Sequence, residues 1–212
     1  MKLISLLSGG IDSAVSSYLM LERGADIVFV HFHNQTLQKR YVENKVVKTA
    51  KIVSEAVKKK TKLYLVPFKD FQQAIIQKVA AKYRMIVYRR VMFMIAEEIR
   101  KKEDAKGFVT GDSMGQVASQ TLDNISVLYE ATKEPILTPL LGMDKVDIIK
   151  IAEKIGTFET SILPYSDCCS FMLAKHPETK ADITKIKEME KEIDIQKLIK
   201  DTLEKTKIIP LP

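Results

Sequence analysis

The stretch KLISLLSGGIDS at residues 2–13 decides the fold, because an apolar run there ends in two adjacent glycines. The apolar part, residues 2–7, predicts a short buried strand, and residues 13–23 predict a helix. Gly9 and Gly10 lie between the two, where they let the backbone turn sharply and come close to a ligand. The sequence therefore predicts a strand, a tight turn and a helix whose N-terminus is open to a bound group.

Strand and helix signals alternate along the rest of the chain. Further apolar segments predict strands at residues 26–32, 62–66, 107–110 and 135–138. Apolar residues at helical spacing predict helices at residues 35–59, 69–81, 84–102, 116–130, 144–155 and 180–204. This order implies right-handed crossovers and an α/β fold, a doubly wound parallel five-stranded sheet with helices on both faces. Ligands of such folds bind beyond the carboxyl ends of the strands, where we expect the loops 8–13, 31–36 and 111–120.

The composition is that of an ordinary globular protein. Of the 212 residues, 46% are hydrophobic and 29% are charged, which excludes a coiled coil, a disordered chain and a disulfide scaffold as the main architecture. No apolar run reaches the length of a membrane span, so we expect a cytoplasmic protein without a membrane partner. We expect one domain at residues 1–175 and a helical tail at residues 176–212 that packs on the same domain.

Basic side chains are concentrated in two of the predicted helices. The formal net charge is +7; residues 35–60 carry eight basic side chains against two acidic ones, and residues 82–102 carry seven against two. Such stretches are typical of a protein with a polyanion partner, although two solvated helix faces give the same pattern. Charge alone favours the solvated faces, so the polyanion partner needs support from a site.

The turn at residues 8–13 has the groups that bind phosphate. Free N–H groups and the positive end of the following helix favour an anion, and Ser8 and Ser13 add hydroxyl donors. Asp12 can hold a magnesium ion that offsets the phosphate charge. A tight turn with a serine or aspartate helix cap has the same sequence, and these residues alone support both interpretations equally. The spacing matches neither GxxxxGK[ST] nor GxGxxG.

In this position, SGGIDS resembles the PP-loop of the ATP pyrophosphatases, which cleave ATP between the α and β phosphates. Segments further along the chain are similar to tRNA 4-thiouridine synthetases. These segments are VHFHN at 30–34, YRRVM at 88–92, VTGDSMGQVASQTLDN at 109–124, PLLGMDKVDIIKIAEKIGT at 139–157 and PYSDCC at 164–169. The resemblance extends from residue 3 to residue 175, and it implies the same doubly wound fold that the strand pattern predicts.

Carried over position by position, the resemblance implies a site for ATP and magnesium. It assigns nucleotide contacts to Leu6, Leu7, Ser8, Gly9, Gly10, Asp12, Ser13, His31, Phe32, Arg89, Gly111 and Gln120. Asp12 is in addition the metal ligand and a catalytic residue, and Cys168 is the catalytic, sulfur-handling cysteine. Read without the resemblance, His31 with His33 would be a metal pair that lacks further ligands, Arg89 a solvated helix residue and Gln120 an ordinary helix residue.

Cys168 and Cys169 are the only cysteines of the chain, and they are adjacent. Neighbouring residues are poor disulfide partners, because a bridge requires Cα atoms further apart than one peptide unit. Two small buried side chains are one interpretation. Their place after PYSD, on a predicted loop, favours a reactive role for Cys168, with Cys169 relaying sulfur, resolving a disulfide or packing.

The resemblance implies an ATP-dependent tRNA sulfurtransferase, which adenylates the C4 oxygen of a uridine, releases pyrophosphate and then transfers persulfide sulfur. Two alternatives stay open: activation of a small molecule for sulfur transfer in thiamine thiazole synthesis, and a nucleotide-binding module without turnover. Members of this family usually carry an RNA-binding region before the PP-loop domain, and here the first predicted strand begins within the first three residues. We therefore expect tRNA to bind with a separate RNA-binding subunit, a persulfide donor such as a cysteine desulfurase, and a homodimer.

Overall fold

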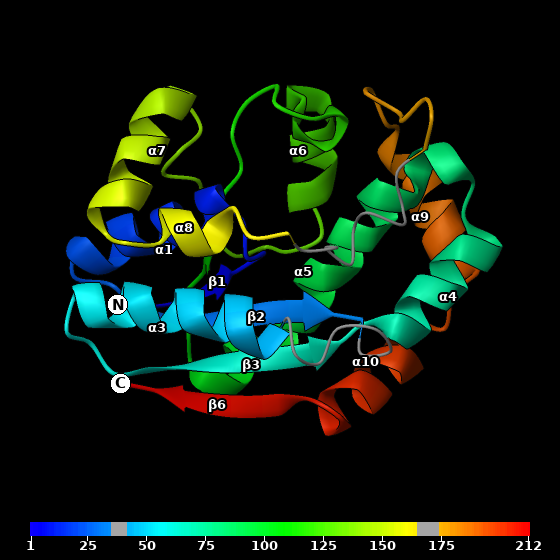
Figure 1. The fold of residues 1–212 in the computed structure, drawn as a ribbon. Coiled ribbons are helices and arrows are strands. Elements are labelled where there is room, and N and C mark those ends of the chain that lie inside the picture. Colours follow the sequence, from blue (N-terminus) through cyan, green and yellow to red (C-terminus); the bar gives the residue numbers. More distant parts are fainter. Residues whose placement is uncertain (35–41, 165–173) are drawn as a thin grey trace.

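The computed structural model describes residues 1–34, 42–164 and 174–212, with the backbone alone at residues 42–44. Within these ranges, a six-stranded sheet has the order β5-β4-β1-β2-β3-β6 (Figure 1). The strands are β1 (Lys2–Leu6), β2 (Asp26–His33), β3 (Thr61–Pro67), β4 (Phe108–Val109), β5 (Ile136–Leu137) and β6 (Lys207–Leu211). The first five are parallel, and β6 is antiparallel to β3. The strand order reverses between β1 and β4, which is where ligands of open α/β sheets bind.

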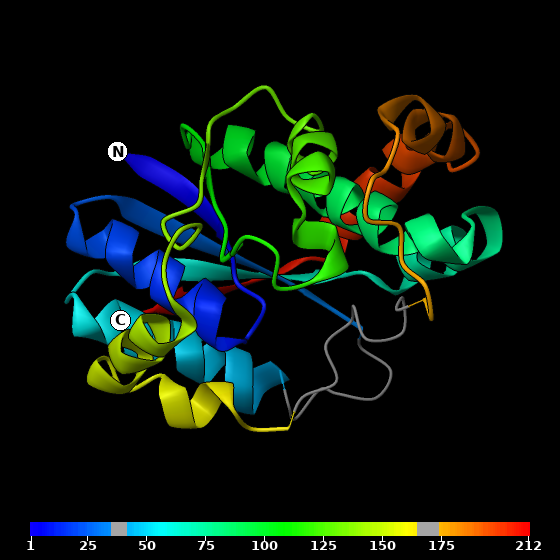
Figure 2. The ribbon, with the colours of Figure 1, turned by 90° about the horizontal axis from the view of Figure 1, so that it is seen from above.

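Helices cover both faces of the sheet, as Figure 2 shows from above. One face carries α1 (Ile11–Glu22), α3 (Lys48–Ala56), α7 (Lys145–Lys154) and α8 (Phe158–Ser161). The other carries α4 (Lys69–Lys78), α5 (Arg84–Glu103), α6 (Leu122–Tyr129), α9 (Ile183–Lys191) and α10 (Ile195–Glu204). Successive strand residues point to opposite layers: Val28 and Val30 pack on the α5 side, and Ile27 and Phe29 on the α1 side.

Side-chain caps determine where several helices begin. The Asp144 carboxylate accepts a hydrogen bond from the Val146 N–H at 2.8 Å, and the helix start predicted near Asp144 is confirmed. The helix predicted from residue 116 begins only at Leu122. Gly115 adopts a left-handed φ of 72°, and a 3-10 turn at Ala118–Gln120 precedes the helix.

The α/β fold class is confirmed, whereas the expectation of five strands is wrong. The sixth strand, β6, lies at the end of the chain, where the sequence shows only KIIPL before the final proline. It occupies a sheet edge, which tolerates Pro210 because no strand among the described residues pairs with its outer side. The helix predicted over 180–204 is two helices, because Asp194 interrupts it and caps α10.

The C-terminal segment packs on the rest of the chain through α5. The Arg90 side chain is 2% exposed, and its Nε donates to Glu190 of α9 at 2.6 Å. Ile186 and Ile199 of α9 and α10 belong to the same buried cluster as Val91 of α5. The boundary expected at residue 175 stays a prediction, because residues 165–173 lie outside the described ranges. No helix in the described ranges is long and apolar enough to cross a bilayer.

Candidate functional site

The carboxyl ends of β1, β2 and β4 border a cavity of about 620 Å³. Helix α5 forms a further wall, and Ala174, Pro177 and Glu178, which precede α9, also line the cavity. This is the position that the strand reversal between β1 and β4 predicts, and the volume is that of a small-molecule site.

The glycine turn after β1 holds its own hydroxyl groups in a compact arrangement. The Ser8 N–H donates to Ser13 Oγ at 3.1 Å, and the two serine Oγ atoms are 3.0 Å apart. The Gly10 N–H donates to Ser8 Oγ at 3.1 Å. Gly9 has a left-handed φ of 87°, and Gly10 is the N-cap of α1. The turn thus places the start of a twelve-residue helix at the cavity, where the helix dipole favours an anion.

The loop after β4 lies directly on the start of α1. A Cβ atom on Gly111 would lie 2.6 Å from the Ser13 nitrogen and 2.8 Å from the Asp12 carbonyl carbon. Only glycine allows two backbones to approach so closely. Gly111 therefore joins two of the three predicted loops into one site.

Asp12 lies in the first turn of α1, and its carboxylate pairs with the first residue of α7. The Lys145 ammonium donates to Asp12 Oδ1 at 2.6 Å, and the Asp12 side chain is 24% exposed. A carboxylate has about four lone-pair positions, and Lys145 takes one of them. Among the described residues, Asp12 has no second hydrogen-bond donor, so it can accept a cation.

Arg89 extends from α5 to a buried carboxylate after β4. Arg89 Nη2 donates to the two carboxylate oxygens of Asp112 at 2.7 and 2.8 Å, and Asp112 is 3% exposed. Burial alone would raise the pKa of the Asp112 carboxyl. The Arg89 charge and the hydrogen bonds that the carboxylate accepts outweigh this effect, and the pKa lies below its usual range.

The inner wall of the cavity, which lies between β2 and α5, is apolar. It is formed by Val30, Phe32, Met85, Ile86 and Met92. Beside it, His31 donates from Nδ1 to the Leu7 carbonyl at 2.7 Å, which fixes the tautomer of the ring. This wall can accept a flat apolar group such as a nucleobase.

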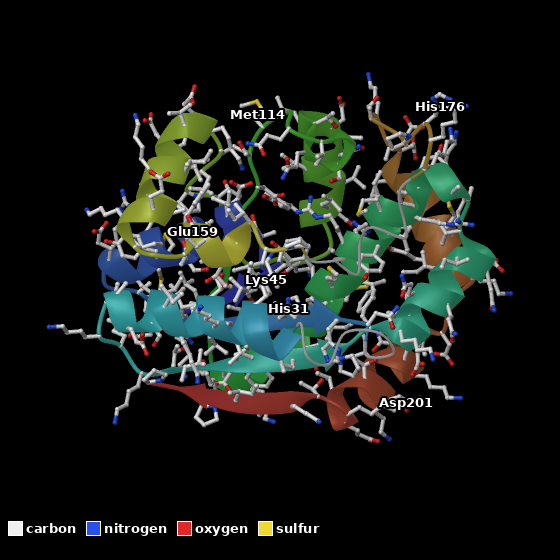
Figure 3. All side chains as sticks on the ribbon, viewed as in Figure 1. His31, Lys45, Met114, Glu159, His176 and Asp201 are labelled. Atoms are coloured by element: carbon white, nitrogen blue, oxygen red, sulfur yellow. The ribbon has the colours of Figure 1, made fainter. Side chains whose placement is uncertain are left out.

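Two buried side chains hold the segments on either side of residues 165–173. Lys45, 6% exposed, donates from Nζ to the carbonyls of Ser161 and Leu163, both at 2.8 Å (Figure 3). Its Cε would lie 3.9 Å from a Cβ on Gly9. On the other side, Asn124 Nδ2 donates to the carbonyls of Ala118 and Glu178 at 2.7 and 2.8 Å. Residues 161–163 are thus anchored next to the glycine turn, and Glu178 next to the Gln120 turn.

The residues predicted from the resemblance converge on this cavity. All of the predicted nucleotide contacts line it except Gly9, where an added Cβ would lie 3.2 Å from the Val46 side chain. Cys168 and its neighbour Cys169 lie outside the described residues. The roles of the lining residues stay predictions.

Sequence reasoning missed several lining residues, among them Asp112, Thr110 and the pair Lys82–Glu178. Asp112 could have been found, because an acid directly after a predicted strand end lies at the ligand edge of the sheet. The Lys82–Glu178 ion pair, 3.1 Å long, joins residues 96 positions apart and left no local signal.

Comparisons of the sequence and of the structure with known proteins identify one group of related proteins. A family model described as thiamine biosynthesis protein (ThiI) matches residues 1–195. A protein of Clostridium acetobutylicum named probable tRNA sulfurtransferase is 42% identical over 206 residues, which are 97% of this chain and 53% of that protein. A crystal structure of a 4-thiouridine synthetase–RNA complex with bound ATP superposes with a TM-score of 0.94 at 35% identity, over 100% of this chain and 55% of the other.

A more distant structure shows the fold alone. The NMN synthetase of Francisella tularensis has a TM-score of 0.57 at 14% identity, over 96% of this chain and 76% of the other. The chain spans about half the length of the curated relatives it matches.

Proposed function

Because the chain belongs to the thiamine biosynthesis protein (ThiI) family, as its PP-loop and its segment 109–124 predicted, we propose that it is the ATP-using part of a tRNA sulfurtransferase. It adenylates the C4 oxygen of a uridine in tRNA and prepares that carbon for sulfur. One observation carries the proposal: the carboxyl ends of three strands that are far apart in sequence, β1, β2 and β4, meet at one cavity beside the glycine turn. The names of the relatives and the ATP-bound 4-thiouridine synthetase support it.

The cavity offers one region that suits the base of ATP and another that suits its phosphates. The apolar wall of Val30, Phe32 and Met85 accepts the adenine, and the turn at residues 8–13 receives the phosphates on its N–H groups and hydroxyls. Arg89 also lines the cavity, where its charge can stabilise the phosphoryl group that is transferred. The same residues would bind another nucleoside triphosphate less well if its base did not fit the wall.

Magnesium fits Asp12 better than it fits the other cavity aspartate. Carboxylate oxygen is the ligand that Mg²⁺ prefers, and Asp12 is partly exposed with one partner, Lys145. Asp112 is buried, and its oxygens accept several hydrogen bonds already. When bound, the ion would offset the phosphate charge during transfer.

The proposed reaction proceeds in three displacements. The uridine O4 attacks the α-phosphorus of ATP, the bond to the β-phosphate oxygen breaks and pyrophosphate leaves. The outer sulfur of a persulfide then attacks C4, and AMP leaves with the former uridine oxygen. The sulfur on C4 is still joined to its carrier cysteine by an S–S bond, so a second thiolate attacks the carrier sulfur; a disulfide forms and 4-thiouridine is released. The turn and Arg89 orient the triphosphate and stabilise the charge that develops on it. Cys168 carries the sulfur in this proposal, on the basis of its place in PYSDCC alone.

The ion pairs of the two basic stretches guide where we propose that tRNA binds. In the basic stretch 82–102, Arg90 pairs with Glu190 at 2.6 Å and Arg100 with Glu97 at 2.8 Å, so these charges are neutralised within the protein. On α3, Lys48 and Lys51 are exposed and form no ion pair among the described residues. We therefore assign the contacts with tRNA phosphates to the α3 side. The proposal also includes a separate RNA-binding subunit, a persulfide donor and a homodimer.

A second candidate function has one observation in its favour, the description of the matching family as a thiamine biosynthesis protein. Sulfur transfer to a precursor of the thiamine thiazole would use the same activation by ATP and the same cysteine. The two functions differ in the acceptor, so adding bulk tRNA to the assay separates them.

The test compares pyrophosphate release from ATP by the parent chain and by Asp12→Ala. We expect the variant to lose about two orders of magnitude in rate, since a metal that stabilises transition-state charge is worth several kcal/mol. Its stability should change by less than about 1 kcal/mol, because the lost ion pair is partly exposed. Asp147→Ala is the matched control: Asp147 is a first-turn acid that pairs with Lys150 at 2.8 Å. Parental pyrophosphate release by Asp12→Ala would refute the role of that residue.

A further inference from the structure

The cavity residues Arg89 and Gln120 both donate hydrogen bonds to the carboxylate of a third lining residue, Asp112. Arg89 is on α5, and Gln120 is in the 3-10 turn before α6. Asp112 accepts from Arg89 Nη2 at 2.7 and 2.8 Å and from Gln120 Nε2 at 3.3 Å. Thr110 Oγ1 and the Tyr129 hydroxyl donate to it at 2.9 and 3.0 Å. The two side chains that reach the cavity therefore share one buried support.

The orientation of the Gln120 amide follows from the chemistry of its partner. An ionised carboxylate only accepts hydrogen bonds, so the amide must turn its NH₂ group toward Asp112. The carbonyl oxygen, Oε1, then points away from Asp112. It is buried and has no hydrogen-bond donor among the described residues, although Gln120 lines the cavity. A buried carbonyl without a donor is costly, and a ligand that brings a hydroxyl or amino group can satisfy it.

The Arg89 guanidinium is constrained by the same carboxylate. Its side chain is 17% exposed, and one nitrogen contacts both oxygens of Asp112. Arginine has a long side chain with many rotamers, and a buried acid at its tip selects one of them. The positive charge is thus held at the cavity wall before a ligand arrives.

We propose that Asp112 is a positioning residue of the nucleotide site: it holds the Arg89 charge in place and orients Gln120 so that its carbonyl oxygen selects a donor group on the ligand. The proposal rests on ATP being the ligand, as proposed above. In ATP, the donor is either a ribose hydroxyl or the 6-amino group of adenine. Asp112 also lines the cavity, but its oxygens already accept hydrogen bonds from four protein side chains, so in this proposal it acts through Arg89 and Gln120.

The test measures nucleotide affinity for the parent chain and for Asp112→Asn. An asparagine at 112 can present either its oxygen or its NH₂ group, so the Gln120 amide is free to flip. The probes are ATP and three analogues. 2′-deoxyATP and 3′-deoxyATP each lack one ribose hydroxyl, and ITP lacks the 6-amino group. For the parent we expect one of these analogues to bind about tenfold more weakly than ATP, which identifies the donor. In Asp112→Asn that ratio should fall to about threefold or less, and ATP itself should bind about tenfold more weakly.

A second variant and a control keep the test independent of folding. Gln120→Met removes the amide and leaves the other hydrogen bonds of Asp112 intact, so it should also abolish the discrimination between ATP and the analogue. Asp123→Asn makes the same chemical change on an exposed acid and should behave as the parent. In an Arg89→Met background, Asp112→Asn should cost much less ATP affinity than in the parent, since the two act as a unit.

The outcomes separate the inference from the proposed function. If the parent does not bind ATP, the proposed function fails. If the parent binds ATP and both Asp112→Asn and Gln120→Met keep the parental ratios among the four nucleotides, Asp112 orients nothing and the inference is wrong. Additive losses in the Arg89→Met background would likewise contradict it, because a residue that acts through Arg89 cannot keep its full effect once that side chain is removed.

Discussion

Replacing Gly111 by alanine tests the contact that assembles the site. The new Cβ would lie 2.6 Å from the Ser13 nitrogen and 2.9 Å from the Ser13 Cα. Ordinary contact begins near 3.4 Å, so the loop after β4 and the start of α1 must separate by about 0.8 Å. The atoms in contact belong to the backbone, which cannot rotate away as a side chain can. The glycine turn and the loop that carries Asp112 therefore move apart.

Both stability and activity should respond. Overpacking of this kind costs about 1–3 kcal/mol, which for a chain of 212 residues is roughly 2–12 °C in Tm. Pyrophosphate release should fall further than stability does, by about 100-fold, because a displacement near 1 Å misaligns the phosphates with the attacking oxygen. Differential scanning fluorimetry gives the first quantity, and a coupled pyrophosphatase assay gives the second.

The matched control is Gly142→Ala. No atom lies within 4 Å of a Cβ at that position, and Gly142 is not among the glycines with a left-handed φ. This variant should keep the Tm and the rate of the parent. If Gly111→Ala also keeps both, the two loops do not depend on their close contact, and the reasoning fails.

Two further predictions concern pH and RNA. Burial, followed by the nearby charges of His31 and Lys207, lowers the pKa of His33 to about 4, whereas an unfolded histidine titrates near 6.5. The unfolded state thus binds the proton first, so this contribution to stability is complete above about pH 6.5 and is lost as the pH falls toward 4. Urea unfolding measures how the free energy of unfolding changes with pH, and His33→Leu should reduce that change by up to about 3 kcal/mol. The control His176→Leu replaces an exposed histidine and should leave the pH dependence unchanged. For RNA, Lys51→Glu should lower the salt slope of tRNA binding by about 1, while Lys200→Glu on α10 leaves it unchanged; equal slopes would place the RNA elsewhere.

Local sequence signals predicted most of the fold. Neighbouring residues alone determine the apolar run at residues 2–7, the turn at the two glycines and the helix that follows. The structure has each of these features. The parallel arrangement of the strands could be predicted from the alternation of strand and helix signals, because right-handed crossover connections allow few sheet topologies. Strand β6 was missed because its partner β3 lies about 140 residues earlier, so its five residues carry no strong pattern of their own.

Residues of the candidate site could be predicted where the motif of a single loop identifies them. Gly111 and Gln120 came from motifs that the resemblance supplied, and both line the cavity. The support that Asp112 gives them depends on donors from α5, α6 and the loop itself, and no spacing in the sequence reveals such a network. The second ion pair of Arg100 was equally hidden, since Glu134 lies on a distant turn, whereas Glu97 is only three residues away on the same helix.

The most direct test of the proposed activity follows pyrophosphate and 4-thiouridine in the same samples. The chain is incubated with ATP, tRNA and a protein persulfide donor, and the tRNA is then digested to nucleosides for mass spectrometry. For the parent chain we predict tRNA-dependent release of pyrophosphate and AMP, with one 4-thiouridine formed for each AMP. The Cys168→Ser variant should still release pyrophosphate but should make no 4-thiouridine. Release of ADP and phosphate, or of pyrophosphate at a rate that tRNA does not change and without any 4-thiouridine, would contradict it.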